Sequence, residues 1–167
     1  MEDLMNEQEA LEFCEKLLEQ YQKINKTLKE DYNKLIKLKE GFPVQYIENT
    51  DFEDLILKAS NAKFQAILLA RKINGFSSEV QYEVDYLISI FKINIADEAL
   101  SEKFDKITEG LRDAYVNSKK QLKNIRKLND SIQVFADSSE KLIRMFDSDE
   151  INFRRMAEKK NRMMGFS

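Results

Sequence analysis

The chain has 167 residues, with 27 Lys and Arg against 30 Asp and Glu, no His and a single Cys. The lack of histidine and of a second cysteine excludes intrachain disulfides, Cys/His zinc sites, Cys–His nucleophile pairs and Ser-His-Asp triads. Four Gly and one Pro leave too few turn residues for a β-sandwich or barrel, and the formal net charge of −3 gives no bulk signal for nucleic acid.

The first predicted helix covers about residues 6–40. The middle of its apolar stripe recurs at heptad spacing and consists of Cys14, Tyr21, Leu28 and Leu35. Because Cys14 belongs to this stripe, we interpret it as a small buried hydrophobic residue. Asn25 falls within the same stripe, where a polar side chain fixes helix register. Gly41 followed by Pro43 predicts the end of the helix.

The second predicted helix begins with a capping box, Thr50-Asp51-Phe52-Glu53, in which the Thr50 hydroxyl accepts the Glu53 backbone N–H. Apolar residues then repeat at steps of three and four: Phe52, Leu55, Ala59, Ala62, Ala66, Leu69 and Ile73. The alanines allow close approach of a neighbouring helix. Asn74-Gly75 predicts the end of this helix.

A third helix is predicted from Ser78 to a loop near Asn94. The run Ile88–Ile95 is rich in strand formers, but a lone strand would have no pairing partner, so a helix is favoured.

The last predicted helix covers residues 100–146, where apolar positions follow one 4-3 spacing. Gly110, Ser118 and Gln121 weaken its middle, so a bend or local opening is expected there. Asp147-Ser148-Asp149-Glu150 predicts a break before a short final segment over 151–164. The expected fold is all-α: an elongated antiparallel, coiled-coil-like bundle of three to four helices over 1–147. A basic, Met-rich C-terminal helix or tail follows over 148–167.

Enzyme chemistry has little support in the sequence, and we expect neither a cofactor nor a metal site. The glycines are isolated, so no Gly-rich loop can cradle phosphate. The basic cluster at 119–127 is flanked by acids and lacks interleaved aromatics, which favours a solvated face over nucleic-acid binding. Residues 1–4 lack the features of a signal peptide, and no apolar run is long enough to span a bilayer. We therefore expect a soluble, cytoplasmic protein without stable membrane insertion.

The C-terminal end is the best candidate for a partner site. Methionine is flexible and suits binding of varied apolar helices, and here it accompanies phenylalanine beside basic residues. The predicted partner-binding residues are Ile132, Phe135, Leu142, Met145, Phe146, Phe153 and Met156. The alternative is that these stripe residues belong to the core and that the tail packs back onto the bundle.

Two segments carry a family resemblance: Asp51-Phe52-Glu53-Asp54-Leu55, which opens the second helix, and residues 122–132, LKNIRKLNDSI, in the closing helix. With the long first helix, this layout resembles the FlgN-type flagellar export chaperones of type III secretion over residues 5–147. The resemblance implies a non-enzymatic chaperone that holds amphipathic C-terminal helices of hook–filament junction proteins before export. Its physical basis would be a partner helix completing an apolar groove.

The competing hypothesis is a structural coiled coil. In that case the apolar stripes are covered by self-association, and the protein is a homodimer or an adaptor subunit that scaffolds a complex.

Overall fold

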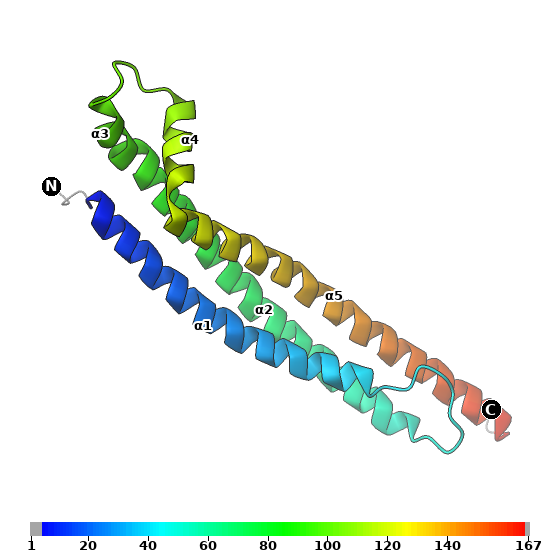
Figure 1. The fold of residues 1–167 in the computed structure, drawn as a ribbon. Helices are drawn as coiled ribbons and strands as arrows, with labels where there is room; N and C mark the ends of the chain where they lie inside the picture. The colour runs from blue at the N-terminus through cyan, green and yellow to red at the C-terminus, as the bar shows by residue number, and fades with distance from the viewer. Residues whose placement is uncertain (1–4, 166–167) are drawn as a thin grey trace. The chain divides into compact units, whose positions relative to one another are not determined.

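The structure, a computed structural model, describes residues 5–165. The helices are α1 (Glu7–Glu40), α2 (Phe52–Ile90), the π-helix η1 (Phe91–Ile95), α3 (Ala96–Ser101), α4 (Glu109–Ser118) and α5 (Lys120–Met163) (Figure 1). Residues 5–165 contain no strand, which confirms the all-α fold class. The signal-peptide argument concerned residues 1–4, which lie outside the described part, as do 166 and 167 of the predicted tail.

The chain divides into two compact units. Unit 1 comprises residues 1–26 and 75–134, and unit 2 comprises residues 27–74 and 135–167. α1, α2 and α5 each contribute one segment to both units, whereas η1, α3 and α4 belong to unit 1. None of these division points coincides with the boundary expected between residues 147 and 148.

In unit 1, segments of α1, α2 and α5 pack around an apolar core, and α4 folds back against η1 and α3 (Figure 1). Tyr21 of α1 meets Phe76 of α2 edge to face, with ring centroids 5.6 Å apart. Asn129 of α5 donates a hydrogen bond of 2.8 Å to Gln81 of α2. The buried core includes Ala10, Cys14, Val80, Val84, Leu87, Phe91, Val116, Leu122 and Ile125.

In unit 2, α1 and α2 are joined by the loop 41–51, which covers one end of the core. Phe42 of this loop contacts Phe146 and Phe153 of α5 edge to face, with centroids 6.1 and 5.4 Å apart. The alanines predicted to allow close helix approach, Ala59, Ala62 and Ala66, are at most 1% exposed. Small side chains therefore line the buried face of α2 in this unit.

The first helix agrees with prediction. α1 begins at Glu7 because the Asn6 side chain accepts the Glu9 backbone N–H at 2.9 Å, while the Asn6 N–H donates to the Glu9 carboxylate at 3.0 Å. This reciprocal pair is a capping box. α1 ends at Glu40, directly before Gly41. Asn25 is 7% exposed, so it lies within the buried stripe as predicted.

The predicted end of a helix at Asn74-Gly75 is wrong, since α2 continues through both residues to Ile90. Ile73, Phe76 and Val80 on either side are buried, and their burial outweighs the cost of about 1 kcal/mol for a helical glycine. The loop expected near Asn94 is also wrong: η1 and α3 continue the helix, and the Ala96 N–H bonds to the Phe91 carbonyl. The choice of helix over strand for Ile88–Ile95 is confirmed.

The capping residue of α2 is Asp51 and not Thr50. The Asp54 backbone N–H donates to the Asp51 carboxylate at 3.1 Å. Because an aspartate is as good an N-cap as a threonine, the TDFE motif admits two helix starts one residue apart.

The single helix predicted over 100–146 is wrong. α3 ends at Ser101, residues 102–108 form a loop, and Thr108 caps α4 by accepting the Leu111 N–H. The opening expected near Ser118 is confirmed, because Lys119 has an extended backbone between α4 and α5.

The break predicted at Asp147–Glu150 is also wrong, because α5 continues to Met163. These acids are paired in unit 2: Lys63 of α2 lies 3.0 Å from Asp147 and 2.8 Å from Glu150, and Lys39 of α1 lies 3.1 Å from Asp149. The predicted break rested on the interruption of the apolar spacing, but pairing with cations on neighbouring helices stabilises these acids within a continuous helix.

Candidate functional site

Most of the predicted partner-binding residues lie in the core. Ile132 in unit 1 and Phe135, Leu142, Phe146 and Phe153 in unit 2 are at most 7% exposed. Only Met145, which is 42% exposed, and the partly exposed Met156 lie at the surface. The structure therefore does not gather the seven residues on one accessible face.

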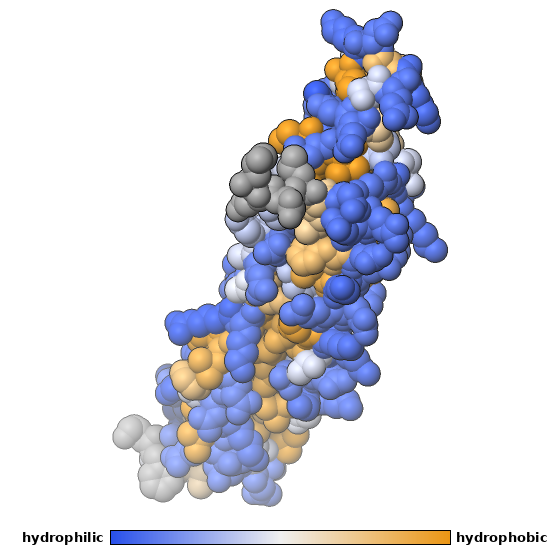
Figure 2. All heavy atoms as spheres, turned by 90° about the vertical axis from the view of Figure 1, so that its left-hand side faces the viewer, coloured by the Kyte–Doolittle hydropathy of each residue, from blue (hydrophilic) through white to orange (hydrophobic). Residues whose placement is uncertain are grey.

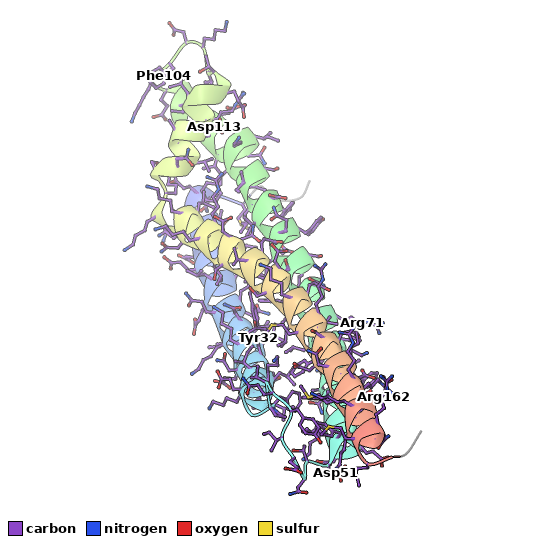
Figure 3. The ribbon with its side chains drawn as sticks, turned by 90° about the vertical axis from the view of Figure 1, so that its right-hand side faces the viewer. Tyr32, Asp51, Arg71, Phe104, Asp113 and Arg162 are labelled. Carbon is purple, nitrogen blue, oxygen red and sulfur yellow. The ribbon has the colours of Figure 1, made fainter. Side chains whose placement is uncertain are left out.

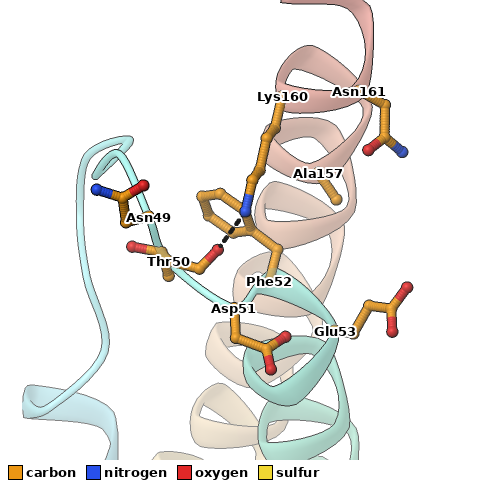
Figure 4. Close-up of a pocket in the computed structure, with 8 residues that line it drawn as sticks. All are labelled: Asn49, Thr50, Asp51, Phe52, Glu53, Ala157, Lys160 and Asn161. Carbon is orange, nitrogen blue, oxygen red and sulfur yellow. Dashed lines mark hydrogen bonds between the residues drawn. The ribbon is translucent and has the colours of Figure 1, made fainter. Parts of the chain in front are cut away.

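The basic residues of the C-terminal segment are partly engaged within unit 2. Arg154 pairs with Glu150 at 2.8 Å, and the Lys159 ammonium lies 5.6 Å from the centre of the Tyr46 ring. Lys160 donates to the Thr50 backbone carbonyl at 3.0 Å (Figure 4). These contacts attach the end of α5 to the loop 41–51 and to the start of α2.

A hollow of about 300 Å³ lies beside this attachment, between Asn49–Glu53 and Ala157, Lys160 and Asn161 (Figure 4). Two of the polar side chains that line it take part in hydrogen bonds that stabilise the fold. Asp51 caps α2, and Lys160 donates a hydrogen bond to the Thr50 carbonyl. Among residues 5–165, no three Cys, Asp or Glu side chains form a potential metal-ligand group.

Two ionic clusters stabilise unit 1. Burial opposes ionisation of Glu7, but hydrogen bonds from Lys119 and Tyr115 outweigh it and hold the pKa of Glu7 below its ordinary value. Arg112 contacts Asp97 through two hydrogen bonds, of 2.7 and 3.0 Å, and lowers the pKa of Asp97. Both clusters join one helix to another, which is a structural role.

Cys14 is fully buried, as predicted. Burial, with a smaller contribution from the charge of Glu15, raises the pKa of its thiol to about 11. The thiol is thus neutral at physiological pH and inaccessible to a substrate.

Sequence reasoning missed an exposed aromatic surface on α2 in unit 1. Tyr82 and Tyr86 of α2 are 70% and 54% exposed, and Ile93 of the π-helix η1 that follows is 66% exposed, whereas Val80, Val84 and Leu87 on the opposite side of α2 are buried. We call Tyr82, Tyr86 and Ile93 the tyrosine face. The sequence contains a signal for this surface. Tyr82 and Tyr86 lie outside the stripe formed by Val80, Val84 and Leu87, so the helix carries apolar side chains on two sides.

Only acidic charges surround the two tyrosines in sequence. Residues 73–91 contain Glu79, Glu83 and Asp85 but neither Lys nor Arg. Burial, followed by the charges of Glu79 and Glu83, raises the pKa of Tyr21 to about 12. Acidic residues therefore flank the tyrosine face along α2.

A second apolar surface lies on α2 in unit 2. Leu57, Phe64 and Leu68 are 59%, 61% and 42% exposed, on the side opposite the buried alanines. We call them the outer stripe. A hollow of about 260 Å³ between α1 and α2 adjoins Leu68. Figure 2 shows hydrophobic residues interspersed among hydrophilic ones on one face of the molecule.

Comparison with protein-family models, curated proteins and solved structures gave no match. None of the described helices combines the length and the apolar character required to cross a membrane.

Proposed function

We propose that this chain is a non-enzymatic protein-binding module that holds an amphipathic helix of a protein partner on the tyrosine face. The exposure of Tyr82 and Tyr86 one helical turn apart, on a helix already buried on its other side, carries this proposal. A helix that is apolar on two sides needs a partner on each.

The chemistry of the tyrosine face selects the partner. Tyrosine is enriched among the residues that dominate binding energy, because its ring offers a large apolar area and its hydroxyl a hydrogen bond. The i, i+4 spacing matches apolar anchors on a partner helix. Glu79, Glu83 and Asp85 favour a helix whose apolar stripe is flanked by Lys or Arg.

The resemblance of residues 5–147 to FlgN-type export chaperones supplies a specific partner class. In this proposal the partner is the amphipathic C-terminal helix of a hook–filament junction protein, which the chain holds in the cytoplasm before export. A partner segment that folds on binding loses conformational entropy, so the complex remains dissociable.

The test uses the full chain as bait in a lysate of the native cell, with captured proteins identified by mass spectrometry. We expect Tyr82→Ser/Tyr86→Ser to lower recovery of the junction protein at least about tenfold, the equivalent of 1.4 kcal/mol, because two anchors are lost. Circular dichroism should show unchanged helicity, since both side chains are exposed.

Two further variants locate the site. Phe104, in the loop between α3 and α4 (Figure 3), is 44% exposed, and Phe104→Ser serves as a matched control that should leave recovery of the partner unchanged.

Met145→Ser/Met156→Ser tests the C-terminal location predicted from sequence. If the methionine variant loses the partner and the tyrosine variant retains it, the tyrosine face is not the binding site. Failure of the wild-type chain to recover any export client contradicts the proposed partner class.

A further inference from the structure

The outer stripe of α2 belongs to a longer series of exposed positions in unit 2. Asp54, Leu57, Asn61, Phe64, Leu68 and Arg71 follow one another at steps of three and four residues, the spacing of a coiled-coil seam, and all are exposed. Arg71 is exposed, and no ion pair joins it to another residue in the described part of the chain. The seam thus has an acidic end, where Asp54 also pairs with Lys58 at 2.6 Å, an apolar middle and a basic end.

This seam is complementary to itself when reversed. In an antiparallel pair centred between Asn61 and Phe64, Leu57 of one copy faces Leu68 of the other, and Asp54 faces Arg71. The neighbouring exposed charges Glu53 and Lys72 lie at the acidic and the basic end of the seam, so they add to the same charge polarity. A parallel pair would instead place Asp54 against Asp54 and Arg71 against Arg71, which is repulsive.

We infer that the outer stripe of α2 binds a second copy of this chain, forming an antiparallel homodimer with its two-fold axis between Asn61 and Phe64. Such an interface is isologous, as a two-fold dimer requires. Its apolar part is short, which predicts a reversible dimer rather than an obligate one. This inference is independent of the tyrosine face, which lies in unit 1.

Sedimentation velocity of the full chain over a concentration series tests the apolar part of the proposed dimer interface. We expect the mass to rise from one to two chains with concentration, and Phe64→Glu to raise the dimer Kd at least about tenfold by placing two carboxylates near the axis. Phe64 is 61% exposed, so helicity should not change. Ile151→Glu, at a 43% exposed position of α5 in the same unit, is the matched control and should dimerise like the wild type.

Charge exchange tests the antiparallel register. Arg71→Glu places a carboxylate opposite the second copy's Asp54 and should weaken the dimer. Asp54→Arg should also weaken it, whereas Asp54→Arg/Arg71→Glu should restore the wild-type Kd to within about threefold, because opposite charges again face each other. Only the antiparallel register predicts this rescue.

Three results would overturn the inference: a wild-type chain that stays monomeric at all accessible concentrations, a Phe64→Glu variant that dimerises normally, or a double charge variant that is no tighter than the single ones. Two crossed measurements distinguish failure of the dimer from failure of the proposed function. Phe64→Glu should recover the partner from lysate like the wild type, and Tyr82→Ser/Tyr86→Ser should dimerise like the wild type.

Discussion

Phe42 contributes to the core of unit 2 although it lies outside any helix. Its ring meets Phe146 and Phe153 edge to face, so the loop 41–51 is attached to α5 by aromatic contacts. Edge-to-face pairs contribute about 0.5–1.5 kcal/mol beyond their buried area. The three rings explain why residues that suggested a partner site are instead inaccessible.

Phe146→Ala should therefore destabilise the protein strongly. Phe146 is fully buried, and truncating a buried phenylalanine costs about 3–5 kcal/mol through lost transfer free energy and a residual cavity. Urea unfolding followed by circular dichroism measures this change. Met145→Ala, at the adjacent exposed position, is the control and should cost less than about 1 kcal/mol. Equal stability of the two variants would show that Phe146 is not part of the core.

At the scale of the element, α2 shows how burial overrides local helix-ending signals. Asn74-Gly75 has the composition of a helix end, yet the buried residues before and after it continue with helical periodicity. The opposite occurs at residues 102–108. There the 4-3 spacing of Phe104 and Ile107 predicted a helix, but both side chains lie in a loop and Phe104 is 44% exposed.

Gly75→Ala should stabilise the protein by about 0.5–1 kcal/mol, because alanine restricts the unfolded chain and favours helix. A Cβ atom at Gly75 would meet no described atom within 4 Å, so the substitution introduces no clash. Thermal and urea unfolding measure the gain. Gly75→Pro, which removes a backbone donor within the same turn, is the opposing control and should lower stability by about 3 kcal/mol or more. A loss of stability in the alanine variant would mean that the helix does not continue through this position.

At the scale of the whole molecule, carboxylates that are paired in the folded state make the free energy of unfolding decrease at acid pH. Hydrogen bonds from Lys63 and Arg154 hold the pKa of Glu150 below its ordinary value of 4.5, and the pKa values of Asp97 and Glu7 are also lowered. A carboxylate with a lowered folded pKa stabilises the fold above its unfolded pKa, and this contribution is lost as the pH falls through the folded pKa. The unfolding free energy should thus be level from pH 7 to about 5 and decrease below about 4.5.

Urea unfolding at a series of pH values checks this prediction. Glu150→Gln should be less stable than the wild type at pH 7 and should show a shallower decrease at acid pH, because it has one lowered pKa fewer. An identical acid slope in the two proteins would show that Glu150 is not linked to folding.

The sequence predicted the all-α fold, the bounds of α1 and the buried alanines of α2, because regular apolar spacing and capping residues determine these features directly. It did not predict the continuity of α5, since the pairing of Asp147 and Glu150 with Lys63 depends on a distant segment. It also missed the tyrosine face, although the spacing of Tyr82 and Tyr86 was visible, because an exposed tyrosine on a helix surface is ordinary and the sequence alone does not show how far each side chain is exposed.

The division of the chain has a consequence for its synthesis. Neither unit is a continuous stretch of sequence, because unit 1 is completed only at residue 134 and unit 2 only after residue 134. On the ribosome, the stripes of α1 and α2 therefore emerge long before the segments of α5 that cover them. The nascent chain should therefore expose the apolar stripes of α1 and α2 until α5 has been synthesised, and chains in such a state are prone to aggregate.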